Sequence, residues 1–171
     1  SVERMNPVIW EDLEDGFFVD SGITYSGAAT NVVTGLDHLN DKIVVALANG
    51  VVYDGLVVTS GQVTLPGSAT ASTIHVGLPY TSELQPFRLD TDSTIGQSMG
   101  RVKRIGGLHL RLQDSADFTY EWNGTNVEHD LGTDIFSGDA PIDYHTNSDL
   151  DPSITIKQSK PLPLGIQAIV V

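Results

Sequence analysis

Apolar residues in this chain recur in short runs that glycine, asparagine, aspartate and proline separate. In residues 43–48 both alternating sets of positions are apolar, which predicts a strand covered on both faces. Asn49-Gly50 follows, and the next run is 51–53. An Asn-Gly pair between apolar runs favours a type I′ turn, because both central residues of that turn need a positive φ. The pattern therefore predicts a β-hairpin.

Further turn residues continue this pattern. Asp54-Gly55 predicts a bulge or a second turn, and Ser60-Gly61 predicts a turn that joins 56–58 to 62–65. Pro66-Gly67 should end that strand, because proline cannot donate to a strand ladder. In 74–78 apolar residues alternate with His75 and Gly77, which predicts a strand with one apolar face.

The longest strand is predicted at 101–113, after a polar loop at 83–100. Leucines fill one face of it, and the other face carries His109 and Arg111. In strict alternation Arg104 would fall on the leucine face, where an unpaired charge is costly. A bulge at Gly106-Gly107 would reset the register.

Shorter strands are expected at 118–122, 135–136, 154–156 and 164–171. The last of these is apolar on both faces, so it should be central in a sheet or covered by a neighbouring chain. Short strands with turns between them predict an all-β antiparallel fold, with a small barrel or hairpin module and a β-sandwich-like sheet. The expected organisation is an N-terminal arm with the first strands (1–34), the barrel or hairpin module (35–87), a loop (88–100) and the sheet (101–171), with the two modules forming one compact unit.

Composition narrows the class of protein. A length of 171 residues fits one domain or two small modules. The chain has no cysteine, which excludes disulfides and thiolate metal sites, and no apolar run approaches the ~20 residues of a membrane span. Its 22 acidic and 9 basic residues give a net charge of −13, which argues against a sequence-reading DNA-binding domain.

Charge is unevenly distributed along the chain. Four of the nine cations lie in one short segment, whereas residues 114–151 contain ten acids and neither lysine nor arginine. One interpretation is a solvated acidic surface beside a basic strand. The other is electrostatic pairing between neighbouring subunits, with the cations as the contact candidates. These cations are Arg101, Lys103, Arg104 and Arg111.

Candidate chemistry is sparse. The histidines show neither an HExxH pattern nor the i, i+4 spacing of a helical metal site, and the chain has neither a GxSxG nor a GxxxxGK[ST] motif. We therefore expect no catalytic residues and no cofactor. Oxygen ligands for calcium are a weak candidate against an ordinary turn, since the glycine and glutamate of an EF-hand are missing. These candidate ligands are Asp143, Asn147, Asp149 and Asp151.

Trp10, Tyr120 and Trp122 could form a platform that binds sugars, and Tyr120 and Trp122 are the candidate surface-binding residues. Aromatic residues make up only 7% of the chain, so packing in the core or at an interface is the favoured interpretation.

Six segments of the chain, in a fixed order, share a pattern with one known family. They are Phe17–Tyr25, Gly35–Leu39, Ala48–Val52, Val76–Ser82, Gly100–Ile105 with Leu110–Leu112, and Pro161–Ile169. In this order they resemble the C-terminal domain of the tail nozzle or tubular structural proteins of short-tailed bacteriophages, which are longer proteins. The resemblance implies an excised C-terminal domain of a non-enzymatic virion component, made in the cytoplasm of a bacterial host and assembled as a ring through which DNA leaves. It implies other tail proteins and copies of itself as partners, and transient passage of DNA without specific binding. The alternative is a module that binds a glycan or receptor on the host surface.

Overall fold

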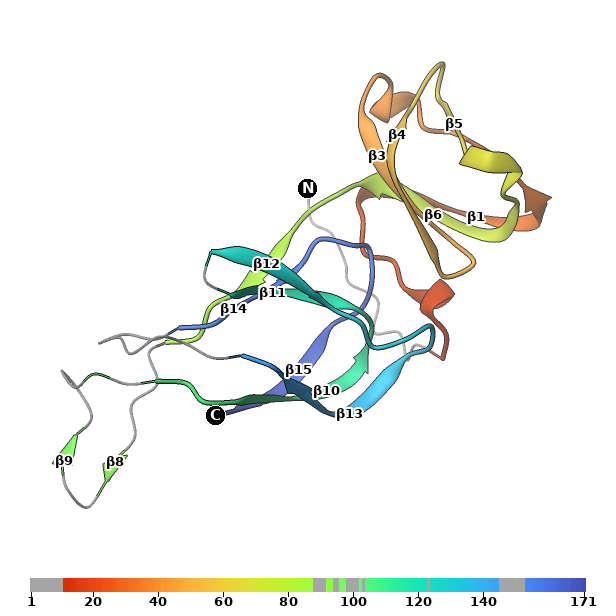
Figure 1. Cartoon of the computed structure of the whole chain (residues 1–171). Coiled ribbons are helices and arrows are strands. Elements are labelled where there is room, and N and C mark those ends of the chain that lie inside the picture. Colours follow the sequence, from red (N-terminus) through yellow and green to blue (C-terminus); the bar gives the residue numbers. More distant parts are fainter. Residues whose placement is uncertain are drawn as a thin grey trace. The chain divides into compact units, whose positions relative to one another are not determined.

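The structure, a computed structural model, describes residues 11–87, 92–93, 96–97, 102, 104–122, 124–144 and 153–171. Its contacts divide the chain into two compact units (Figure 1). The first unit comprises Ser1–Tyr80 with Lys160–Pro163, and the second comprises Thr81–Ser159 with Leu164–Val171.

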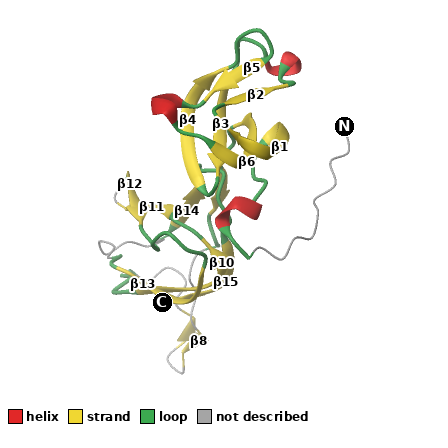
Figure 2. Ribbon diagram, turned by 90° about the vertical axis from the view of Figure 1, so that its right-hand side faces the viewer, coloured by secondary structure: helices red, strands yellow, loops and turns green. Residues whose placement is uncertain are grey.

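Strands dominate the described residues (Figure 2). The first unit contains β1 (Asp20–Thr30), β2 (Val32–Thr34), β3 (Ile43–Ala48), β4 (Val51–Val57), β5 (Gln62–Thr64) and β6 (Ala71–Leu78). Three 3₁₀ turns accompany them: η1 (Leu13–Asp15), η2 (Asp37–Leu39) and η3 (Pro66–Ser68). The second unit contains β7 (Ser82–Leu84), β8 (Asp92–Ser93), β9 (Gly96–Gln97), β10 (Leu108–Ser115), β11 (Phe118–Trp122), β12 (Thr125–His129), β13 (Phe136–Ile142), β14 (Thr155–Gln158) and β15 (Gly165–Val170).

The predicted all-β class is confirmed. All strand pairs are antiparallel, and the described sheets are open rather than closed into a barrel. The first module was predicted to be a small barrel or a hairpin module, and its described residues form a hairpin module. Within the described residues, no helix has the length and apolar character needed to span a membrane.

The first unit is built on a four-stranded sheet in the order β1-β6-β3-β4. The predicted β3–β4 hairpin is confirmed, with Asn49 at φ 44° and Gly50 at φ 79° in the turn. Gly55, at φ 69°, lies where the register shifts, which confirms a bulge in β4. Ser60-Gly61 also forms the expected turn, but β5 pairs with β2 rather than with β4.

One face of this sheet packs on the β2–β5 pair. Val44, Ala46 and Ile74 from the sheet share a buried cluster with Val33 of β2 and Val63 of β5. Because β3 is buried on both faces from its second residue onward, the prediction for 43–48 is confirmed for all but its first residue, Ile43.

The strand at 74–78, predicted to have one apolar face, is covered on its other face as well. His75 and Gly77, which lie on that other face, are buried. The Phe17 ring lies edge-on against the His75 ring with centroids 5.6 Å apart, and the His75 ring also bonds the main chain of η1. Gly77 lets β1 approach closely, because a Cβ there would lie 2.7 Å from the Asp20 carbonyl oxygen. A segment distant in sequence covers this face, which alternation along β6 cannot reveal.

The second unit has the form of a β-sandwich. One sheet has the order β13-β10-β15 and the other the order β12-β11-β14-β7. Side chains of both sheets share one core, in which Leu110 and Leu112 of β10 lie with Phe118 of β11 and Ile156 of β14. Alternation of the leucines, predicted from sequence, is confirmed in β10.

Several boundaries differ from those predicted, and the strand expected at 135–136 is the longer β13, which extends to Ile142. The strand expected at 101–113 begins only at Leu108, because glycine weakens a strand and Gly106-Gly107 precede it. Arg104 lies outside the strand and is exposed, so neither a buried cation nor a bulge at the glycines is needed. In the expected loop at 83–100, Glu83 and Leu84 belong to β7, and the short paired strands β8 and β9 also lie in this range.

The last strand, β15, is an edge strand of its sheet in the described structure. The prediction that it is central is therefore wrong for the described residues. The other prediction, that a neighbouring chain covers it, stays open.

Candidate functional site

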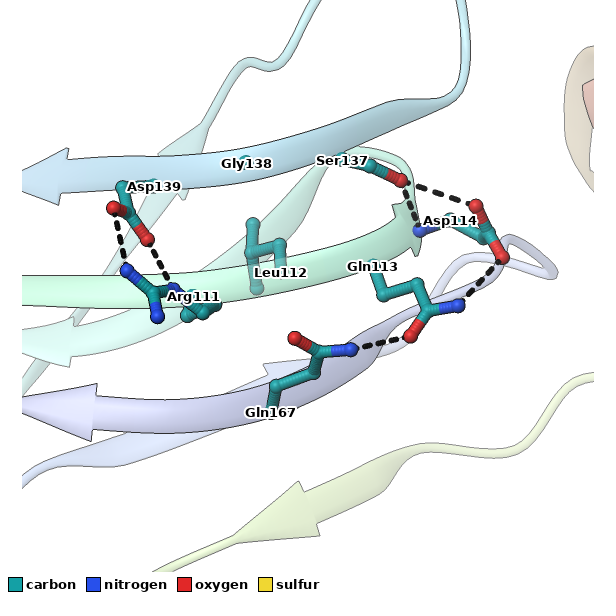
Figure 3. A pocket seen from close by; sticks show the side chains of 8 residues that line it. All are labelled: Arg111, Leu112, Gln113, Asp114, Ser137, Gly138, Asp139 and Gln167. Atoms are coloured by element: carbon teal, nitrogen blue, oxygen red, sulfur yellow. Dashed lines mark hydrogen bonds and ion pairs between the residues drawn. The ribbon is translucent and has the colours of Figure 1, made fainter.

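Polar side chains on the exposed face of the β13-β10-β15 sheet line a shallow depression (Figure 3). It is open to solvent and has a volume of about 420 Å³. The alternation that buries the leucines of β10 turns Arg111 and Gln113 to this face. The lining residues are Arg111, Leu112, Gln113, Asp114, Ser137, Gly138, Asp139 and Gln167.

Arg111 and Asp139 form a bidentate ion pair across β10 and β13. The guanidinium Nε lies 2.7 Å from Asp139 Oδ1, and Nη2 lies 2.9 Å from Oδ2. The two residues are directly opposite in the strand register. Hydrogen bonding from Arg111 lowers the pKa of the Asp139 carboxyl, and the same bond raises the pKa of Arg111. The guanidinium is thus occupied by an acid of its own chain.

Two bulges shape the depression. The register of β10 shifts against β13 between Leu112 and Ser115, and against β15 next to Arg111. Asp114 adopts a left-handed φ of 46° at the first bulge, an unusual conformation for a residue with a side chain. Its main-chain N–H donates to the Ser137 hydroxyl at 2.9 Å, and that hydroxyl donates to Asp114 Oδ1 at 3.1 Å.

The second bulge gives Gln167 its position. It is the extra residue of β15, and its side-chain Nε2 donates to the side-chain oxygen Oε1 of Gln113. Figure 3 shows the two amides meeting across the strands. The polar groups of the depression therefore bond largely to one another. Such a surface suits a hydrated face or the polar rim of a contact.

The four predicted contact cations have different outcomes. Arg101 and Lys103 lie outside the described residues, and Arg104 is exposed. Of the two that the structure describes, Arg111 lies in the depression. Its partner Asp139 has no local signal in the sequence, because 28 residues separate the two and only strand pairing joins them.

The weak calcium candidate stays untested. Asp143 is described and exposed, whereas Asn147, Asp149 and Asp151 lie outside the described residues. Among the described residues, no group of three or more His, Cys, Asp or Glu side chains is arranged to hold a metal ion.

The two candidate aromatic residues occupy different environments. Tyr120 is 5% exposed, and its ring meets that of Tyr144 edge-on with centroids 6.1 Å apart. Burial, followed by the charge of Asp143, raises the pKa of Tyr120. A ring buried in this way cannot stack on a sugar from solvent. Trp122 is half-buried against the same core.

A second polar cluster lies on the other sheet of the second unit. Lys157 Nζ lies 3.0 Å from Glu121 Oε2 and 3.9 Å from Glu83 Oε2. Hydrogen bonding to Glu121 raises the pKa of Lys157. No local pattern in the sequence predicts this cluster, since its members come from three strands that only the sheet order brings together.

Neither a scan against protein-family models nor a search of curated proteins found a match to this chain.

Proposed function

We propose that this chain is a structural, non-enzymatic domain of a bacteriophage tail, part of the nozzle or tube through which DNA is ejected. The observation that carries the proposal is the order of six sequence segments that resemble the nozzle proteins of short-tailed phages. These segments run from Phe17–Tyr25 near the start to Pro161–Ile169 near the end. The proposed location is the virion, and the proposed partners are other tail proteins and copies of the chain.

Charge supports a conduit of this kind. Each phosphate that a protein neutralises adds to a salt-dependent affinity for DNA, and such affinity would slow the passage of DNA. The chain carries a net charge of −13, which opposes that contact. On the described face, the guanidinium of Arg111 is already bonded to Asp139 through two nitrogens. A cation held in this way is less available to a phosphate.

Electron microscopy tests the proposed assembly. The longer protein implied by the resemblance should form a hollow ring, because a ring is what a nozzle requires. Particles without a central channel under all conditions would contradict the proposal.

A DNA titration at low salt tests the proposed electrostatics. We expect the unmodified chain not to bind duplex DNA, and the double variant Arg101→Glu with Lys103→Glu to behave alike. The control is Lys42→Glu with Lys160→Glu. Each reversal changes the charge by −2, so both variants go from −13 to −17. Binding by the unmodified chain that only the Arg101–Lys103 variant abolishes, with assembly unaltered, would refute the pairing of these cations with acids.

The alternative function, a module that binds a host-surface glycan or receptor, depends on Trp122. This ring is half-buried, whereas Tyr120 is in the core. A glycan array and a cell-binding assay with the unmodified chain, Trp122→Ala and the control Phe87→Ala, at an exposed aromatic residue, separate the two functions. Binding that Trp122→Ala abolishes and Phe87→Ala preserves would favour the alternative.

A further inference from the structure

Edge strands of the larger sheets differ in how well they resist pairing with another strand. An edge strand leaves one row of N–H and C=O groups unpaired, and charged residues, proline and bulges at the edge block strand addition. In the described three- and four-stranded sheets, five of the six edge strands carry an acid. These acids are Asp20 in β1, Asp54 in β4, Glu83 in β7, Glu128 in β12 and Asp139 in β13.

The sixth edge strand, β15, has no such residue. Its sequence, Gly-Ile-Gln-Ala-Ile-Val, contains neither a charge nor proline. The strand at the opposite edge of the same sheet, β13, carries both Asp139 and Pro141. Within one sheet, therefore, one edge is protected and the other is open.

The side chains of β15 also remain incompletely covered. Ile166 and Ile169 pack against the core of the second unit but are only half-buried. On the opposite face of the sheet, Val170 is 56% exposed. An added strand would cover apolar surface on both faces of β15, which stabilises a contact in proportion to the area removed from water.

We propose that β15 pairs antiparallel with β15 of a second copy of this chain, so that the two three-stranded sheets join. Two identical strands paired in this way are related by a twofold axis. The distribution of acidic residues favours this contact over the other possible contacts between copies. Two copies with a net charge of −13 repel each other, and joining any two of the other five edges would bring acids together. The β15 edges meet without a charged side chain on either strand.

This contact does not rest on the proposed tail function. A twofold contact closes after two copies, whereas a ring grows by head-to-tail contacts. The absence of a ring would leave the β15 contact intact, and the absence of the β15 contact would leave a ring intact.

The test uses the whole chain and two matched variants, Val170→Glu in β15 and Val57→Glu in β4. Both valines lie in edge strands, are similarly exposed (56% and 54%), and give the same change in net charge, from −13 to −14. Sedimentation velocity from micromolar to millimolar concentration should show a dimer of the unmodified chain. Val170→Glu should weaken dimerisation about tenfold, because each dimer gains two carboxylates at the joined edge. Val57→Glu should leave it unchanged.

Amide hydrogen exchange gives a readout that needs no variant. Amides of 165–170 should gain protection as the concentration of the unmodified chain rises, while those of β4 should not. Circular dichroism of Val170→Glu at low concentration checks that the variant folds. The proposal is wrong if the chain stays monomeric with unchanged β15 exchange, or if Val57→Glu weakens dimerisation as much as Val170→Glu. A dimer that Val170→Glu leaves intact, while the variant folds, would also overturn it.

Discussion

Replacing Thr24 with valine should destabilise the first unit through its effect on His75. The His75 ring is 6% exposed, and each of its nitrogens has a partner at 2.8 Å. Nε2 contacts the Glu14 carbonyl oxygen, which only accepts, so Nε2 carries the proton. In the neutral ring Nδ1 then accepts from the Thr24 hydroxyl. The ring thereby ties η1 to β1 and β6.

The magnitude follows from the group that the substitution leaves behind. Valine has a similar shape but no hydroxyl, so Nδ1 of a buried ring loses its donor. A buried acceptor without a partner costs about 1–3 kcal/mol, and partial access of water places the expected loss at about 1–2 kcal/mol. A loss of 1.4 kcal/mol is about a tenfold change in the unfolding equilibrium. Thr64→Val, at an exposed position of β5, should change stability by less than about 0.5 kcal/mol.

Urea unfolding followed by amide NMR signals of the β1-β6-β3-β4 sheet measures this unit by itself. A double-mutant cycle with His75→Phe isolates the pairwise effect, because Thr24→Val should cost almost nothing once the imidazole is absent. An equal cost of Thr24→Val in both backgrounds would refute the reasoning. So would a cost no larger than that of Thr64→Val.

Three further predictions concern turns, core and pH. Gly61→Ala should destabilise the first unit more than Gly67→Ala. Both glycines have a left-handed φ, which costs roughly 1–2 kcal/mol for alanine, but only at Gly61 would a Cβ collide with the Asp37 carboxylate. Equal losses of stability in urea unfolding would contradict this prediction. Leu110→Ala should cost about 2–5 kcal/mol, because Leu110 is 0% exposed, and calorimetry showing a loss below about 1 kcal/mol would argue against its place in the core. Burial lowers the pKa of His129. The contribution of His129 to stability is therefore present above the unfolded pKa of about 6.5 and is lost as the pH falls through the lower folded pKa. His129→Gln should flatten the acid side of a curve of stability against pH, and an unchanged curve would contradict the assignment.

Local sequence determined several of the strands and several of their turns. Asn49-Gly50 specified a hairpin because the positive φ values that it needs act on residues adjacent in the chain. The leucines of β10 specified their buried face for a similar reason, since alternation is a property of one strand. These signals are confirmed because none of them depends on which strand lies beside another.

Partners distant in sequence were decided only by the tertiary structure. The pairing of β10 with β13 and β15 set Arg111 against Asp139 and Gln113 against Gln167, across 28 and 54 residues. The covering of His75 by the residues around η1, and the place of β15 at a sheet edge, depend equally on sheet order. Sheet order is fixed by the packing of whole faces, because any strand of suitable alternation can pair with several others. The polar depression and the edge position of β15 in the described sheet therefore belong to the fold. Of the strands that build them, the sequence predicted β15 closely, β10 with too early a start, and β13 only at its first residue.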